Sequence, residues 1–280
     1  MPIKIISDST CDLSPELLET YAITLTRLSV TIGDKTGKDG TEITPDEIYE
    51  YVAKTGNLPK TSAVNVGDYA ALYQEWTEKG YEIIQYCIGS GFSSSYQNAS
   101  LAAENFPNVH VIDTKNLSTG QGYITLYGAR LAKSGASVED VIAKSEIVIS
   151  KMETSFILDQ LEYLHKGGRC SGVVALGANL LKLKPCIEVK DGGMVVGKKY
   201  RGEIQKAAVQ YIQDRLEGRD DIDKSVIFIT HTKCSKEYVD SVRRQVEDLH
   251  IFDEILETDA GCTVTTHCGP STLGVLFSRK

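Results

Sequence analysis

The sequence has no run of 18 consecutive apolar residues, and this absence excludes a transmembrane helix. Its first residues, MPIKIISDST, hold a single Lys and a short apolar run that meets Ser7 and Asp8 at once. Such a beginning is not typical of a secretory signal and instead predicts a buried first strand. We therefore expect a cytoplasmic protein that has no membrane span and makes at most transient contact with a membrane.

The seven Cys residues form no CxxC motif, their number is odd and their spacing is irregular. Without a secretory signal, this pattern predicts free thiols that serve as small core residues in a reducing compartment. Cys262, His267 and Cys268 lie close together, but two further ligands at zinc spacing are missing. No metal site is expected.

Motifs of two enzyme classes are also missing. There is neither a G-x-x-x-x-G-K-[ST] loop nor a G-x-G-x-x-G motif after a strand, which argues against a bound nucleotide and predicts no cofactor. The absence of a G-x-S-x-G elbow, and of a carboxylate evidently paired with His267, argues against a serine hydrolase built on Ser93 and His267.

The charge balance is acidic. The net charge of −8 and the pI near 5.3 argue against a general nucleic-acid binder. One segment departs from this balance, because residues 166–206 hold nine basic and three acidic side chains. This segment is either a solvated face or a site for an anionic ligand or partner.

The 280 residues, 41% of them hydrophobic, suffice for two packed α/β domains. Strand and helix patterns alternate in the first half. Strands are predicted over residues 3–6, 24–32, 81–88 and 109–113, and helices from Ser14-Pro15 and Thr44-Pro45 and over 68–79, 93–106, 118–134 and 138–151. This alternation predicts a mostly parallel sheet with helices on both faces.

The second half shows a different pattern. A hairpin is predicted over 185–190 and 194–201, helices over 161–166, 176–183, 203–216 and 236–249, and strands over 226–232, 251–257 and 273–278. This order predicts an α/β domain with a partly antiparallel sheet. We place the domain change near 150–155 and predict domains over 1–152 and 153–280.

The strongest local pattern is Gly89-Ser90-Gly91-Phe92-Ser93-Ser94-Ser95-Tyr96, which follows a predicted strand and precedes a helix. Free N–H groups, the helix dipole and several hydroxyls there suit an anion, at the sheet edge where open α/β folds bind ligands. Helix capping is the alternative, but it needs only one serine.

Three further segments carry polar groups in loops. Thr61-Ser62 alone is a weak indication, because such residues commonly cap helices. His267 lies in a turn-rich Thr/Gly segment, where a lone His is more often structural than a ligand. In Lys166-Gly167-Gly168-Arg169, the glycines predict a tight turn that exposes a guanidinium suited to carboxylate or phosphate.

Taken together, these segments resemble the DegV family. The motifs that carry the resemblance, in family order, are Asp8-Ser9-x-x-Asp12-Leu13, Thr61-Ser62, Ser93-x-x-Tyr96-Gln97-x-Ala99, Asp113-x(4)-Ser118-x-Gly120-x-Gly122, Lys166-Gly167-Gly168-Arg169-x-Ser171, Lys184-Pro185, Asp191-Gly192 and His267-x-Gly269-Pro270. The resemblance implies a two-domain α/β protein with a long-chain fatty acid in a tunnel between the domains. It also implies a non-catalytic subunit that presents the carboxylate to a separate ATP-dependent fatty acid kinase, on the way to phospholipid synthesis.

By the same resemblance, Thr61 and Ser93 hold the carboxylate, with Ser62 and Ser94 beside them and His267 in the same network. Arg169 and Arg201 match residues linked to kinase docking or to the phosphoryl group. Our candidates for the acyl tunnel are Phe92, Leu117, Ile124, Phe156, Ile157 and Leu158, although ordinary core packing explains each of them.

The sequence departs from the family pattern in three places. It has Thr61-Ser62-Ala63-Val64-Asn65 for T-S-Q-P-S, Ser93-Ser94-Ser95-Tyr96 for Ser-Gly-Thr-Tyr, and Ser271 for a Gly. The hydroxyls and the histidine are retained. A lipid or small-anion sensor of the same fold, without a kinase partner, is the alternative function; the retention of Arg169 and Arg201 favours the kinase-linked one.

Overall fold

The computed structural model describes residues 1–170 and 183–280 of the chain. Its first sheet has four strands in the order β2-β1-β6-β7, and every pair in it is parallel. The strands are β1 (Ile3–Asp8), β2 (Thr24–Thr26), β6 (Glu82–Cys87) and β7 (Val109–Asp113).

Helices cover both faces of this sheet, as the sequence predicts. They are α1 (Pro15–Thr20), α3 (Val66–Glu78), α4 (Ser95–Ala103), α5 (Ser118–Lys133) and α6 (Val138–Lys151). Successive strand residues point to opposite faces, so Ile83 packs with α3 and α4 whereas Ile84 packs with α5 and α6.

The second sheet has six strands in the order β10-β9-β8-β13-β11-β12. Only β11 and β12 pair in parallel, so the prediction of a partly antiparallel sheet is confirmed. The strands are β8 (Met152–Ile157), β9 (Leu183–Lys190), β10 (Gly193–Arg201), β11 (Ile222–His231), β12 (Glu254–Asp259) and β13 (Leu273–Arg279).

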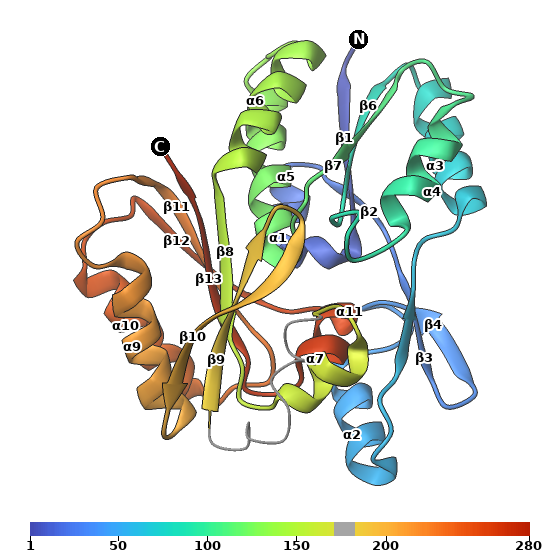
Figure 1. The fold of residues 1–280 in the computed structure, drawn as a ribbon. Coiled ribbons are helices and arrows are strands. Elements are labelled where there is room, and N and C mark those ends of the chain that lie inside the picture. Colours follow the sequence, from blue (N-terminus) through green and yellow to red (C-terminus); the bar gives the residue numbers. More distant parts are fainter. Residues whose placement is uncertain (171–182) are drawn as a thin grey trace.

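One face of this second sheet is covered by α9 (Ile204–Leu216) and α10 (Lys236–Asp248), and the other face packs against α5. Ile227 and Phe228 illustrate the alternation, because the first packs with α9 and α10 and the second with α5. The molecule is therefore layered, with α5 and α6 between the two sheets and a further helix pair outside each (Figure 1).

A small third sheet, β4-β3-β5, lies below these layers (Figure 1). It consists of β3 (Ser29–Ile32), β4 (Lys35–Lys38) and β5 (Lys60–Ser62), next to α2 (Pro45–Thr55), α7 (Leu161–Gly167) and α11 (Cys262–Cys268). The prediction of one strand over 24–32 is wrong, because the chain leaves the parallel sheet after β2 and begins the small sheet at β3.

Three elements near the site were not predicted, namely β5, β8 and α11. The sequence pattern predicts a loop at Thr61 and Ser62, but the two residues end the strand β5. The strand β8 follows α6 directly and has Glu, Thr and Ser after its first residue. The helix α11 consists mainly of Thr, Val and Cys, which favour helices weakly. The helix predicted over 176–183 lies almost wholly outside the described residues, and Leu183 begins β9. The domain boundary at 152/153 stays a prediction.

Candidate functional site

Segments far apart in the sequence meet around one cavity of about 140 Å³. They include the end of β5, the loop between β6 and α4, the helix α11 and the residue Arg169 after α7. The lining residues are Leu28, Thr61, Ser62, Ala63, Ile88, Phe92, Ser93, Ser94, Leu117, Arg169, Met194, Thr263, Val264, His267 and Cys268. The structure thus brings together all five residues predicted to surround a carboxylate.

Thr61 and His267 form the centre of what we call the polar end of the cavity, which also includes Ser62, Ser93 and Ser94. The Oγ1 atom of Thr61 lies 2.9 Å from Nε2 of His267, although 206 residues separate them. Thr61 is held by the pairing of β5 with β3, opposite Val30.

The serines belong to the turn that begins α4. Ser93 Oγ accepts the N–H of Ser95 at 3.2 Å and lies 3.0 Å from Ser95 Oγ, so this serine contributes to the helix cap. The N-cap residue itself is Ser94, and its side chain makes no capping hydrogen bond. The capping role accordingly accounts for one serine of this pair and leaves the other unexplained.

The turn is fixed by two aspartate side chains, the buried Asp8 and the half-buried Asp113, and by a close backbone contact. Asp8 accepts the N–H of Ile88 at 2.7 Å, and Asp113 accepts the N–H and the hydroxyl of Ser90 at 3.1 and 2.6 Å. At Gly91, a Cβ atom would overlap the carbonyl oxygen of Gly192 at the tip of the β9–β10 hairpin. Glycine is therefore required where this turn meets the hairpin.

Burial determines the charge of His267. It lowers the pKa of His267 to about 4, and the positive charge of Arg169 acts in the same direction. The imidazole is therefore neutral at pH 7. Its Nδ1 atom is buried and has no hydrogen-bond partner among the described residues, and Gly167 packs so closely against it that a Cβ there would overlap it.

The other end of the cavity is apolar. Phe92, Leu117 and Cys268 belong to a hydrophobic cluster that also contains Phe156 and Leu158. A second cavity of about 30 Å³ adjoins this end and is lined by Leu117, Cys268 and Phe156 among others. Leu117 and Cys268, together with Val264, line both cavities.

The six tunnel candidates divide into three groups. Phe92 and Leu117 line the first cavity, and Phe156 lines the second; Leu158 packs in the same cluster without lining either. Ile124 and Ile157 lie elsewhere, and their placement beside these cavities is wrong. Ile124 packs among α5, α6 and the parallel sheet, and Ile157 packs against α9 and α10.

Outside the polar end, a second hollow of about 280 Å³ shares Thr61, Arg169 and His267 with the cavity. Lys60, Lys166 and Arg169 line it, and we call these three residues the basic mouth. The guanidinium of Arg169 donates to the carbonyl of Gly167 at 2.7 Å. The polar end therefore opens toward cationic side chains.

Comparisons with known proteins identify the family of this chain. The model of the family described as "Uncharacterised protein, DegV family" matches residues 2–280. The chain belongs to the DegV family. A DegV domain-containing protein of Clostridium perfringens is 31% identical over 280 residues, covering 99% of each chain.

Two solved structures are similar over nearly the whole chain. One, described as showing fatty acid binding of a DegV family protein from Thermus thermophilus, is 30% identical with a TM-score of 0.89, and the match covers 99% of this chain and 100% of that one. The other, a stearic acid-binding protein from Eubacterium ventriosum, is 29% identical with a TM-score of 0.84, covering 99% and 98%.

In this DegV chain, the two predicted arginines lie apart. Arg169 lines the cavity and the basic mouth, whereas Arg201 ends β10, the strand that begins beside the cavity at Met194. Arg201 lies seven steps along the strand from Met194, which is about 23 Å at 3.3 Å per step. Arg201 therefore lies outside the polar end, and its role in docking stays a prediction.

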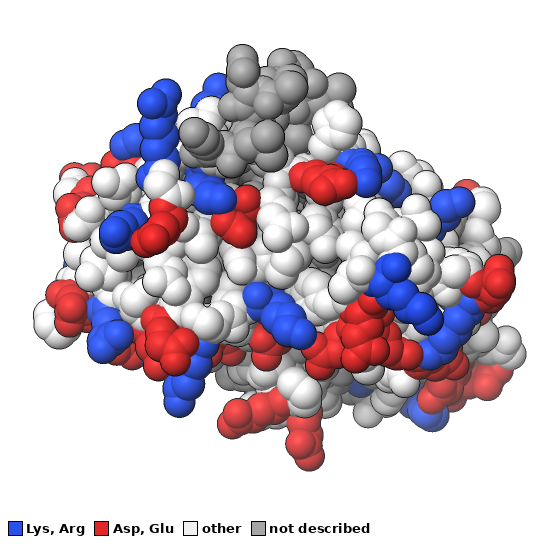
Figure 2. Space-filling view, turned by 90° about the horizontal axis from the view of Figure 1, so that it is seen from below, with Lys and Arg blue, Asp and Glu red and all other residues white. Residues whose placement is uncertain are grey.

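The basic excess of residues 166–206 is largely balanced in space. Lys166, Lys184, Lys190 and Lys198 each pair with a carboxylate at 2.6 to 2.8 Å. Figure 2 accordingly shows cationic and anionic side chains interspersed over the face seen from below. For Lys184, Lys190 and Lys198, which lie outside the basic mouth, a solvated face fits better than an anion site.

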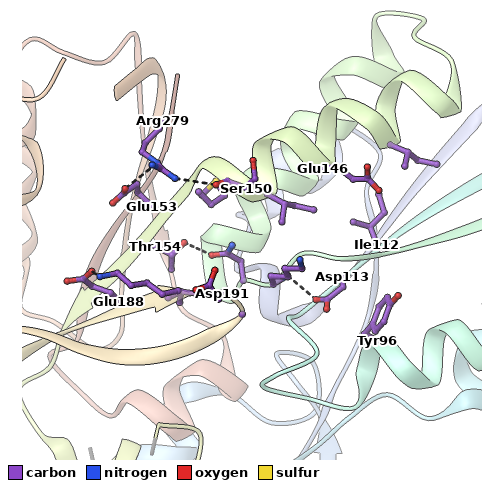
Figure 3. Close-up of a pocket in the computed structure, with 18 of the residues that line it drawn as sticks. Tyr96, Ile112, Asp113, Glu146, Ser150, Glu153, Thr154, Glu188, Asp191 and Arg279 are labelled. Atoms are coloured by element: carbon purple, nitrogen blue, oxygen red, sulfur yellow. Dashed lines mark hydrogen bonds and ion pairs between the residues drawn. The ribbon is translucent and has the colours of Figure 1, made fainter. Parts of the chain in front are cut away.

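A larger hollow of about 1020 Å³ lies on another side, between β7 and α6 on one wall and β8 and the β9–β10 hairpin on the other (Figure 3). Several of its charged residues pair with one another: Glu153 pairs with Arg215 and, at 3.4 Å, with Arg279, and Glu188 pairs with Lys190 at 2.8 Å. Such a charged lining does not suit an acyl chain.

Sequence reasoning missed several cavity residues, namely Leu28, Ile88, Met194, Thr263 and Val264. Four of these residues are apolar and of types that occur equally in the cores, and Thr263 is one of several threonines in its segment, so nothing in the sequence distinguishes them. Within residues 1–170 and 183–280, no group of three or more His, Cys, Asp or Glu is arranged to hold a metal ion. None of the helices described there is long and apolar enough to cross a membrane.

Proposed function

We propose that this DegV protein binds a long-chain fatty acid, with the carboxylate at Thr61, Ser93 and His267 and the tail in the apolar end of the cavity. The observation that carries this proposal is the joining of a hydroxyl-rich polar end to an apolar end in one cavity. The printed descriptions of the Thermus thermophilus and Eubacterium ventriosum relatives support it.

The proton positions at the polar end suit an anion. A buried N–H without an acceptor is costly, and Nδ1 of His267 has no partner, so the proton belongs on Nε2. Nε2–H then donates to Oγ1 of Thr61. The hydroxyl hydrogen of Thr61 is left to donate to a carboxylate, which needs several donors when it is buried.

The tail supplies most of the binding energy in this proposal. Each buried CH₂ contributes ~0.8 kcal/mol, so a sixteen-carbon chain contributes roughly 10 kcal/mol before ordering costs. The first cavity ends at Leu117, Val264 and Cys268, beyond which the second cavity begins. We place the end of a long tail between these residues and Phe156.

The basic mouth supports the second part of the proposal, which is presentation of the carboxylate to a separate ATP-dependent fatty acid kinase in the cytoplasm. Phosphoryl transfer builds negative charge outside the carboxylate, where Lys60 and Arg169 lie. The sequence holds no nucleotide-binding motif, so the ATP would be bound by the partner. Our protein would then serve as the acyl carrier without a reaction of its own.

Replacement of the serine hydroxyl tests the carboxylate site. We expect Ser93→Ala to weaken palmitate binding about tenfold to hundredfold, because a hydrogen bond to a charged group contributes about 1.5–3 kcal/mol. Titration calorimetry with palmitate measures the affinity, and the remote Ser150→Ala serves as the control. Equal affinities of wild type and Ser93→Ala would contradict the assignment.

A further inference from the structure

The helix α11 carries His267. The N–H groups at the beginning of this helix donate to aspartate side chains from distant parts of the chain. Asp12 Oδ1 accepts the N–H of Gly261 at 2.8 Å. Asp39 Oδ1 accepts the N–H of Cys262 at 2.8 Å, and its Oδ2 accepts the N–H of Thr263 at 3.1 Å. The N-cap residue, Gly261, has no side chain with which to cap the helix itself.

This helix needs such support. It has seven residues, mostly Thr, Val and Cys, so both its length and its composition are unfavourable for a helix on its own. Carboxyl oxygens at its beginning satisfy N–H groups that otherwise lack partners. The position of His267, one turn after Thr263, depends on where this helix begins.

Asp39 joins the helix to the small sheet that carries Thr61. Its backbone N–H donates to the carbonyl of Leu28 at 2.9 Å, and its carbonyl accepts a hydrogen bond from Arg27 at 2.7 Å, just before β3. β3 in turn pairs with β5, which holds Thr61. Asp39 at the beginning of the helix and Thr61 near its end therefore both join α11 to the small sheet, in addition to the packing of Cys262 with Val30.

We propose that Asp39 is a positioning residue, which sets α11 so that the His267 imidazole meets Thr61 at the polar end of the cavity. Asp39 lies outside the lining of the cavity and is buried, with 2% of its surface exposed. The expected effect of Asp39 on fatty acid affinity rests on the proposed function. The expected effect of Asp39 on the position of His267 does not rest on it and can be measured without a ligand.

The two aspartates differ in what can replace them. Four donors converge on Asp39, because the hydroxyl of Thr263 donates to it at 2.7 Å and that of Ser9 at 3.2 Å, besides the two N–H groups. Ser9 itself accepts the N–H of Leu28 at 3.2 Å, so its hydrogen is directed to Asp39. An asparagine at position 39 has only one acceptor oxygen. Its NH₂ group, which is a donor, would face N–H or hydroxyl groups that also donate.

Asp12, by contrast, needs to accept only from Gly261. Its other oxygen lies 2.5 Å from the hydroxyl of Ser118, which can accept as well as donate. Asn at position 12 would keep the acceptor for Gly261 and donate its NH₂ to Ser118. The geometry therefore distinguishes Asp39→Asn, which should displace α11, from Asp12→Asn, which should not.

The experiment compares wild type, Asp39→Asn, Asp12→Asn and the exposed Asp68→Asn. The ring titration of His267 is followed by NMR in the ligand-free protein, with its signals assigned by their absence in His267→Gln. Palmitate affinity is measured by titration calorimetry. Far-UV circular dichroism and a thermal transition establish that each variant is folded.

We expect Asp39→Asn to raise the titration midpoint of His267 from about 4 by about one unit or more, because a displaced ring gains water. Palmitate affinity should fall about tenfold. Asp12→Asn and Asp68→Asn should leave both quantities unchanged.

A folded Asp39→Asn with an unchanged His267 midpoint would overturn the inference. If Asp39→Asn does not fold, Asp39→Glu takes its place, because the longer side chain shifts the acceptor oxygens of α11; an unchanged His267 midpoint in this variant would overturn the inference equally. Absence of palmitate binding in wild type would contradict the proposed function, while the His267 titration would still decide the role of Asp39.

Discussion

At the scale of single residues, buried carboxylates hold the turns from which the polar end is built. Asp8 binds the N–H of Ile88 before the serine turn, and Asp12 and Asp39 bind the first N–H groups of α11. The sequence draws attention to Asp8 and Asp12, because they flank a polar loop after the first strand. Nothing in the local sequence indicates a role for Asp39, because its partners Cys262 and Thr263 are more than 200 residues away along the chain.

The polar residues of the cavity were more predictable than the apolar ones. Thr61, Ser93 and His267 belong to polar segments that match the DegV pattern, and the structure brings them together, with Thr61 on β5 and His267 on α11 rather than in loops. Ile124 was misplaced because an isoleucine on a buried helix has the same local pattern whether it faces a cavity or a core. Only the packing of α5 against both sheets decides between these positions.

Asp12 also predicts a pH dependence of stability. Burial raises the pKa of Asp12 to about 8, well above its unfolded value, with Asp39 and Asp8 adding to the effect. The native state therefore holds a proton that the unfolded state releases. This contribution is complete below the unfolded pKa of about 4 and is lost as the pH rises through about 8, by at most about 1.4 kcal/mol per pH unit.

We therefore expect Asp12→Asn to gain stability relative to wild type as the pH rises from 5 to 8. Urea denaturation at several pH values measures the free energy of unfolding of both proteins, and Asp34→Asn on the exposed β3–β4 turn serves as the control. Parallel pH profiles of Asp12→Asn and wild type would contradict the assignment of a retained proton to Asp12.

At the scale of secondary-structure elements, the hairpin β9–β10 and the serine turn depend on each other. The tip of the hairpin contacts Gly91, and Met194 at the start of β10 lines the cavity. Sequence patterns predicted the hairpin and the turn separately. Their contact could not be predicted, because the sequence does not show that the carbonyl of Gly192 lies where a Cβ atom of residue 91 would be.

Gly91→Ala should displace the serine turn from the hairpin. The added methyl would overlap the carbonyl of Gly192, and we expect a loss of about 1–3 kcal/mol in the free energy of unfolding together with weaker palmitate binding. Gly193→Ala is the matched control, because its Cβ would lie 3.7 Å from the nearest atom. Equal stability of the two variants would argue against the contact.

At the scale of the whole molecule, α5 is the element that joins the two large sheets. One hydrophobic cluster contains Ile84 of the parallel sheet, Ile124 of α5 and Phe228 of the mixed sheet. Strand and helix periodicity predicted both sheet types and the helices on the parallel sheet. The strand order of the second sheet was not predictable, since β8 pairs with β13, which is the last strand of the chain.

This layered arrangement places the cavity where the β6–α4 turn, α11, the small sheet and the β9–β10 hairpin converge. No one of these elements contains the site by itself. A ligand in this cavity would contact residues from Leu28 to Cys268, nearly the whole length of the chain. The fold accordingly has to be complete before the site exists.

Mass spectrometry of the lipid extracted from natively purified protein tests the central claim most directly. We predict one long-chain fatty acid per protein molecule in wild type, and a markedly lower amount in Ser93→Ala. A protein that is empty as purified and also fails to take up added palmitate or oleate would contradict the account.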